Sequence, residues 1–310
     1  MISRRALRIR SFQFLFSYFK QNPLPSVEIL KKQCLQSLDK SYIFYLTILS
    51  LLDEFRIQEI NQQEKQKNKF IRSAQDPFIP VFSTHPFFLA LKESKIFYQK
   101  LNEYKVNFGK DKDWTHTVYK TLIKTDFYNT YKNLSNPDKE QQILFVREIL
   151  DFLYNNDLVE HFFEEESQFA QDDLYLSINI TDKTVDEFEN SGNLVILPQY
   201  KDEKIDKKFV EDLIAYTAQN YHAFDDYISK YSKNWDLERI NYSDLLLIKM
   251  CMTELIYMPE IPLKSSVDEY IEISKEYSTP QSYVFINGIL VGVIKDLTEK
   301  GMIKKTTESN

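Results

Sequence analysis

Residues 241–257 read NYSDLLLIKMCMTELIY, a run of apolar side chains with a helix signal at each end. Asn241 is a residue type that accepts a hydrogen bond from the first turn of a helix, and Asp244 favours the same start. Pro259 follows the run and cannot continue a helix. These signals predict one helix over 241–257 with defined ends.

Three further helical patterns lie on either side of this stretch. Residues 207–230 have helical periodicity, and residues 266–277 begin with Ser266 followed by Glu269, the pattern of a capping box. Residues 280–299 follow Thr279 as a cap, with Pro280 at the first helical position. Four successive helices with short connections predict a C-terminal helical bundle.

The N-terminal residues 4–20, RRALRIRSFQFLFSYFK, predict another helix, which Pro23 ends. Its apolar side chains follow one line at helical spacing and a second line on roughly the opposite side (Phe12, Leu15, Phe16 and Phe19; Leu7, Phe14 and Tyr18). We therefore expect this helix to be covered on two faces.

Between these parts lies a long region with several helical patterns and no internal repeat (26–39, 41–64, 86–105, 113–132, 138–155 and 158–171). Residues 174–181, LYLSINIT, alternate weakly, as a single strand would, but one strand does not form a sheet. The 310 residues include only five glycines, which leaves few positions for the tight turns of a β protein. The predicted fold class is all-α.

The charge is unevenly distributed. There are 46 Asp and Glu against 39 Lys and Arg, which excludes a uniformly basic surface for nucleic acid. Residues 1–20 nevertheless carry five positive charges and no acid, and half of the eight arginines lie there (Arg4, Arg5, Arg8 and Arg10). An RNA-binding surface is therefore expected to be local and N-terminal, although a solubilising tail or a transit peptide would also be arginine-rich.

The residue inventory argues against an enzyme. The four histidines are scattered without metal-ligand spacing, and no glycine-rich phosphate-binding loop occurs. No catalytic residue, metal, cofactor or small-molecule substrate is therefore expected. Cys34 and Cys251 are expected to be core thiols of a cytoplasmic protein, and no apolar run reaches the roughly 20 residues that cross a bilayer.

A series of short elements lies in order over residues 235–290 (Trp235 and Arg239; Thr253-Glu254-Leu255; Ile261-Pro262; Val267-Asp268-Glu269 with Glu272; Ser274-Lys275; and FINGIL from Phe285 to Leu290). In this order and spacing they resemble the NusB family of bacterial transcription antitermination factors. The N-terminus resembles the opening helix of the same family, through Arg4-Arg5, Arg8, Gln13 and Leu15-Phe16.

The resemblance implies two small helical subdomains, with the N-terminal helix returning to pack on the C-terminal bundle. It divides the chain into an RNA-binding helix (1–22), a large, mostly helical insertion of unknown role (23–204), a NusB-like bundle (205–300) and a disordered tail (301–310). It also implies binding of boxA-type RNA from rRNA operons, together with the ribosomal protein NusE and RNA polymerase. The alternative is a non-catalytic helical scaffold that has lost RNA binding.

The resemblance and the residue types together give candidate site residues. Arg4, Arg5 and Arg8 fall in one sector of the helix, and a guanidinium both pairs with phosphate and stacks on bases. Three residues occupy family positions near the RNA, with packing inside the protein as the alternative for each (Gln13, Phe16 and Phe285). Three acids are candidates for contact with a basic partner such as NusE, with a favourable first helical turn as the alternative (Asp268, Glu269 and Glu272).

Other members of these elements are expected to be structural. Gly288 and Gly292 are predicted to permit close approach of helices, with Asn287 tying backbone groups nearby. Trp235 and Arg239 are expected to be scaffold residues. Lys249 stands where the resemblance implies arginine, which leaves its role open.

Overall fold

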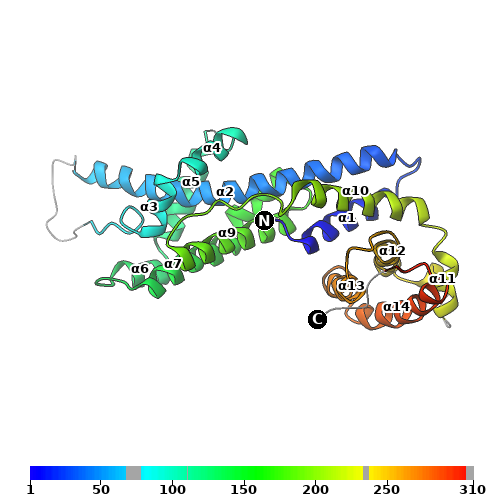
Figure 1. Cartoon of the computed structure of the whole chain (residues 1–310). Coiled ribbons are helices and arrows are strands. Elements are labelled where there is room, and N and C mark those ends of the chain that lie inside the picture. The colour runs from blue at the N-terminus through cyan, green and yellow to red at the C-terminus, as the bar shows by residue number, and fades with distance from the viewer. Residues whose placement is uncertain (68–77, 110, 233–236, 305–310) are drawn as a thin grey trace. The chain divides into compact units, whose positions relative to one another are not determined.

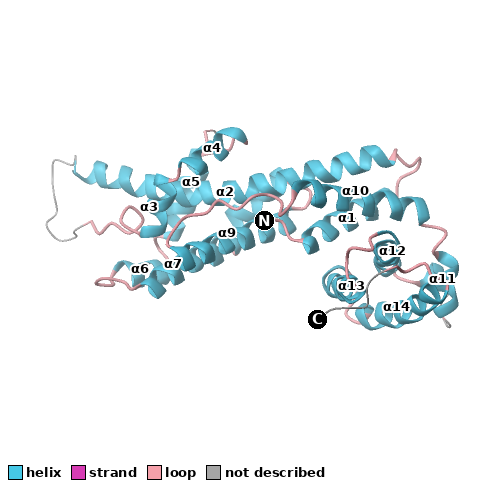
Figure 2. Cartoon of the chain, in the orientation of Figure 1, coloured by secondary structure: helices cyan, strands magenta, loops and turns pink. Residues whose placement is uncertain are grey.

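The computed structural model describes residues 1–67, 78–109, 111–232 and 237–304, and every regular element among them is helical (Figure 2). The all-α prediction is thereby confirmed. Residues 174–181 lie inside a helix, so the weak strand signal there was wrong. Two compact units form: an insertion unit of Met1 and Asp39–Gln199, and a bundle unit of Ile2–Leu38 and the chain from Tyr200 onward (Figure 1).

The insertion unit contains most of a long helix and seven shorter ones. Their bounds are α2 Val27–Lys67, α3 Pro86–Glu93, α4 Lys95–Glu103, α5 Lys112–Leu122, α6 Asp126–Lys132, α7 Lys139–Tyr154, α8 Asp157–Glu166 and α9 Ala170–Ser191. Helices α7, α8 and α9 pack against one another. The patterns expected at 86–105 and 113–132 each divide into two helices, because Ser94 and Thr125 act as side-chain caps in the middle of them.

Helix α2 is the core of this unit. Its residues 41–56 are nearly all buried, as expected for a helix that is apolar on every side. Polar side chains link it to α9: Ser41 donates to Asp173 Oδ1 at 2.6 Å, and the hydroxyl groups of Tyr45 and Thr184 lie 2.8 Å apart. The break expected at 39–41 does not occur, because neither glycine nor proline interrupts the helix there.

The bundle unit is formed by the N-terminal helix, the first turns of α2 and the C-terminal helices. Its elements are α1 Arg4–Tyr18, α10 Glu203–Asn220, α11 Asp225–Tyr231, the short 3-10 helix η1 Leu237–Arg239, α12 Tyr242–Tyr257, α13 Leu263–Tyr277 and α14 Ser282–Glu299. The helix expected at 207–230 is thus two helices. Because α1 packs against α10, α12 and α13, the predicted return of the N-terminal helix to the C-terminal bundle is confirmed.

Helix α12 is the central helix of the bundle unit, in contact with α1, α10, α13 and α14 (Figure 1). Residues 246–255 are all buried, including two charged side chains, Lys249 and Glu254. A buried charge is costly unless a partner of opposite sign reaches it. The fold of this unit therefore depends on which side chains pair with these two residues.

The ends of the C-terminal helices differ in part from expectation. Asn241 caps α12 as predicted, accepting the Ser243 amide at 2.9 Å. Helix α13, however, begins at Leu263 directly after Pro262, so Ser266 lies inside it and the predicted capping box does not form. Helix α14 begins at Ser282 rather than Pro280, with Gln281 at the N-cap position, and the Ser282 hydroxyl donates to Asp244 of α12 at 2.8 Å.

Candidate nucleic-acid interface

Arg8 is an interior residue of the bundle unit. Its Nε and Nη2 donate to the two carboxylate oxygens of Glu254 at 2.8 and 2.7 Å, and Tyr270 donates to the same carboxylate at 3.2 Å. The side chains of Arg8 and Glu254 are 4% and 0% exposed. The expectation that Arg8 lies on an RNA-facing surface is corrected: a buried carboxylate on α12 requires its charge.

Arg5 lies one turn before Arg8 and is more accessible. Its Nε and Nη2 donate to Glu269 of α13 at 2.9 and 3.1 Å, and its side chain is 43% exposed. The hydrogen bond that Arg5 donates to Glu269 raises the pKa of Arg5, and the charges of Glu272 and Glu276 act in the same direction. Arg5 therefore faces solvent at one edge of the bundle unit with an acidic helix beside it.

Arg4 is also partly exposed, at 37%, and pairs with Asp206 of α10. The Arg4 Nε lies 2.8 Å from Asp206 Oδ1, and the guanidinium carbon lies 4.5 Å from the ring centre of Phe209. Asp206 is 6% exposed, and its second oxygen accepts the backbone N–H groups of Lys201 and Asp202. Each of the three predicted arginines thus has a carboxylate partner within the bundle unit.

The aromatic candidates are half-buried. Phe16 packs edge-on against Tyr242 with ring centres 4.8 Å apart, and the Lys20 ammonium lies 3.9 Å from the ring centre of Phe16. Phe285 lies on α14 and is also half-buried. Gln13 is half-buried on α1. The RNA-binding assignment of these three candidates stays a prediction, and Lys20 joins them as an exposed cation that motif reasoning did not single out.

The three acidic candidates lie in the second and third turns of α13. Asp268 is exposed, whereas Glu269 and Glu272 are half-buried. Because α13 starts at Leu263, these acids are not in its first turn, and the alternative explanation by the helix dipole is wrong for them. Glu269 holds Arg5, and Glu272 accepts from Lys275 at 2.5 Å.

The structure supports a packing role for some of the residues that were expected to be structural and not for others. A Cβ atom on Gly292 would lie 2.2 Å from the ring of Tyr231, which explains a glycine there, whereas nothing lies within 4 Å of one on Gly288. Lys249 is buried and its ammonium lies 2.6 Å from Asp225 Oδ1, so it satisfies a core ion pair. Trp235 lies outside the described residues, and Arg239 is an exposed member of η1.

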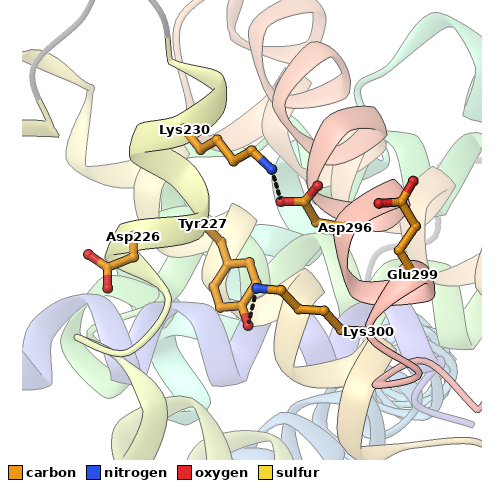
Figure 3. A pocket seen from close by; sticks show the side chains of 6 residues that line it. All are labelled: Asp226, Tyr227, Lys230, Asp296, Glu299 and Lys300. Atoms are coloured by element: carbon orange, nitrogen blue, oxygen red, sulfur yellow. Dashed lines mark hydrogen bonds and ion pairs between the residues drawn. The ribbon is translucent and has the colours of Figure 1, made fainter.

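A charged hollow of about 350 Å³ lies between α11 and α14 (Figure 3). Its cations contact neighbouring side chains: Lys230 Nζ is 2.6 Å from Asp296 Oδ2, and Lys300 Nζ is 3.2 Å from the Tyr227 hydroxyl. The lining is completed by two carboxylates (Asp226 and Glu299). Because acids and bases are mixed there and the lysines already have acceptors, this hollow is a poor candidate for binding a polyanion.

Two general features of the described chain bear on function. No described helix is both long and apolar enough to cross a membrane. Within the same residues, no group of three or more histidine, cysteine, aspartate or glutamate side chains is placed to hold a metal ion.

Comparison with known proteins identifies the family of the chain. A sequence profile of the NusB family matches residues 167–295. The transcription antitermination protein NusB of Salinibacter ruber is 32% identical over 137 residues, which cover 44% of this chain and 86% of that protein. The chain belongs to the NusB family. The NusB protein of Natranaerobius thermophilus is 31% identical over 128 residues, 41% of this chain and 90% of that protein.

Other comparisons show the extent of this membership. The NusB protein of Chloroherpeton thalassium is 36% identical over 100 residues, 32% of this chain and 47% of that protein. No solved structure matches the chain. The profile match begins just before α9 and leaves α1 outside the matched range.

The sequence motifs identify the arginines but not the carboxylates that pair with them. Glu254 and Glu269 follow Arg8 and Arg5 by 246 and 264 residues, so no local spacing connects them. One signal was available: residues 245–256 are apolar on all sides of a helix except Lys249, Thr253 and Glu254. A helix apolar on every side is buried, and the charges within it require buried partners.

Proposed function

We propose that this protein is a transcription antitermination factor that binds RNA as part of a complex with RNA polymerase. The observation that carries the proposal is membership of the NusB family, combined with a helix α1 that joins the bundle and leaves Arg4 and Arg5 partly exposed. The proposed role is binding rather than catalysis. The rRNA operon transcript with a boxA-type sequence is the proposed RNA, and the cytoplasm the proposed compartment.

The proposed RNA path follows α1. Arg5 and Phe16 are eleven residues apart, which places them on nearly the same side of the helix at a separation of roughly 16 Å. A phosphate at Arg5 and a base near Phe16 and Lys20 would then belong to one short single-stranded segment. Gln13 and Phe285 are proposed to border this path. Arg8 is excluded from it because its charge stabilises Glu254.

The proposed protein partner is NusE, on the acidic side of α13. Asp268 and Glu272 are proposed to meet its basic side chains, because both carboxylates lie toward solvent on the helix that also holds Arg5. A charged interface of this kind mainly accelerates association and selects the partner. Replacing both acids by amides should slow NusE association and leave RNA binding by the free protein largely unchanged.

A binding assay tests the RNA proposal. The full chain, with and without NusE, is titrated against labelled boxA-type single-stranded RNA, and the double variant Arg4→Ala/Arg5→Ala is compared with wild type. The matched control is Lys120→Ala/Lys124→Ala, which removes the same charge from exposed positions of the insertion unit. Loss of affinity in the first variant alone supports the proposal; equal affinity of all three proteins overturns it.

A second candidate function is a helical scaffold for the transcription machinery that does not bind RNA. The observation that favours it is the pairing of Arg4, Arg5 and Arg8 with Asp206, Glu269 and Glu254, which removes net positive charge from α1. The same titration decides between the two: capture of RNA polymerase without any salt-sensitive RNA binding identifies the scaffold.

A further inference from the structure

The Arg5–Glu269 pair occupies the group through which Arg5 would bind a phosphate. Two parallel N–H···O bonds, of 2.9 and 3.1 Å, join the guanidinium fork to the two carboxylate oxygens. A phosphate presents two oxygens to the same fork with similar geometry. While Arg5 holds Glu269 in this way, its Nε–Nη2 fork is not available to an RNA phosphate, which can meet only the remaining N–H groups of Nη1 and Nη2.

The carboxylates that pair with Arg8 and Arg4 are less exposed than Glu269. Glu254 is fully buried, so withdrawing Arg8 would leave an uncompensated charge in the core. Asp206 is 6% exposed with its second oxygen bound to two backbone N–H groups, so it cannot turn to water when Arg4 leaves. Glu269 is 27% exposed at the surface of α13. It is the carboxylate of the three that can exchange its arginine for solvent at low cost.

We propose that Glu269 is an internal competitor for the RNA phosphate: it holds the Arg5 guanidinium in the free protein and thereby sets the RNA affinity of α1. This inference rests on the proposed RNA-binding function. Glu269 does not contact RNA itself. It acts by positioning the Arg5 side chain. A ligand that offers Arg5 a single weak acceptor leaves the internal pair intact, whereas a phosphodiester that also engages neighbouring groups displaces it.

The test is RNA titration of Glu269→Gln, which removes the negative charge at nearly constant shape. Releasing Arg5 should raise the affinity for boxA-type RNA by roughly 2- to 5-fold. The slope of log K against log salt should stay close to that of wild type, because Arg5 meets a phosphate in both proteins and only the competing carboxylate is removed. The unfolding midpoint should stay near that of wild type, because the pair is partly exposed.

Two controls separate this effect from a general change in charge. Asp268→Asn removes the same charge from the adjacent exposed position, and we expect it to change the affinity less than about 2-fold, since it does not hold Arg5. In an Arg5→Ala background, Glu269→Gln should give no more gain than Asp268→Asn. Equal gains from Glu269→Gln and Asp268→Asn, or a gain that persists without Arg5, would overturn the proposal.

The same titrations distinguish failure of the proposed RNA-binding function from failure of the competitor role of Glu269. If wild type, Glu269→Gln and Asp268→Asn all leave the RNA unbound at low salt, both RNA binding and the competitor role are wrong. If wild type binds RNA and Glu269→Gln binds no better than Asp268→Asn, the function stands and the competitor role is wrong. Binding that becomes measurable only in Glu269→Gln supports both.

Discussion

Arg5 and Arg8 are adjacent on one helix, but they contribute differently to stability. Arg8→Ala leaves Glu254 buried without its cation, so we expect the free energy of unfolding to fall by about 3–5 kcal/mol. Arg5→Ala breaks a partly exposed pair, and the expected loss is less than about 1 kcal/mol. Urea unfolding of the two variants measures the difference directly.

Arg8→Lys is the informative companion variant, because it keeps the charge and loses the bidentate geometry. Its stability should lie between those of wild type and Arg8→Ala. If Arg8→Ala unfolds at the same urea concentration as Arg5→Ala, the Glu254 pair does not hold α1 to the bundle.

Two glycines on α14 provide a matched pair. In Gly292→Ala the new methyl group would meet the Tyr231 ring, whose nearest carbon lies 2.2 Å from the ideal Cβ position, and the strain should cost about 1–3 kcal/mol. In Gly288→Ala nothing lies within 4 Å, so higher helix propensity should stabilise the protein by about 0.5–1 kcal/mol. Opposite shifts of the thermal midpoint are expected, and shifts of the same sign would contradict the packing of α11 on α14.

At the scale of a single element, the start of α3 depends on a neutral histidine. His85 is buried; its Nδ1 accepts the Phe87 amide at 3.2 Å, and its Nε2 lies 3.1 Å from the Gln142 carbonyl oxygen. A carbonyl only accepts, so Nε2 carries the proton and Nδ1 the lone pair. Burial lowers the pKa of His85 to about 4. Protonation would remove the acceptor that caps α3.

Stability should therefore depend on pH in a defined window. The unfolded chain binds a proton near pH 6.5 and the folded chain only near pH 4, so the contribution of His85 is complete above 6.5 and is lost as the pH falls toward 4. The loss should amount to about 3 kcal/mol. His85→Asn keeps an oxygen acceptor and cannot titrate, so its urea midpoint should fall less steeply across this window. Parallel pH curves for the two proteins would contradict this role of His85.

Much of the arrangement of elements could be predicted from the sequence. The ends of α12 follow from Asn241 and Pro259, and the docking of α1 follows from apolar side chains on two of its faces. The start of α13 was misplaced because Ser266 and Glu269 fit a capping box, whereas in the structure the helix begins at Leu263, directly after Pro262. Local patterns compete in this way, and tertiary packing decides between them.

The sequence alone predicted the cations of the candidate site but not the acids that pair with them. Charge counting locates Arg4, Arg5 and Arg8, but exposure depends on which acids fold against them. Those acids come from α10, α12 and α13, and their pairing is set by the packing of helices far apart in the sequence. Asp206 and Glu254 are buried beneath the arginines, whereas Glu269 stays at the surface, and this difference has no counterpart in sequence spacing.

At the scale of the whole molecule, two units share one continuous helix. Residues 27–38 of α2 belong to the bundle unit and residues 39–67 to the insertion unit. The bundle unit thus continues along α2 as far as Leu38.

The chain as a whole has a net charge of −7, so the salt dependence of RNA binding should depend on its local cations. If α1 is the binding surface, the partly exposed cations Arg4, Arg5 and Lys20 can neutralise about three phosphates, and log K should fall with log salt at a slope near −2. Titrations of single-stranded RNA between about 50 and about 300 mM KCl measure this slope. Arg4→Ala/Arg5→Ala should flatten it to about −0.7, whereas a wild-type slope steeper than about −4 would require further cations and show that α1 is only part of the surface.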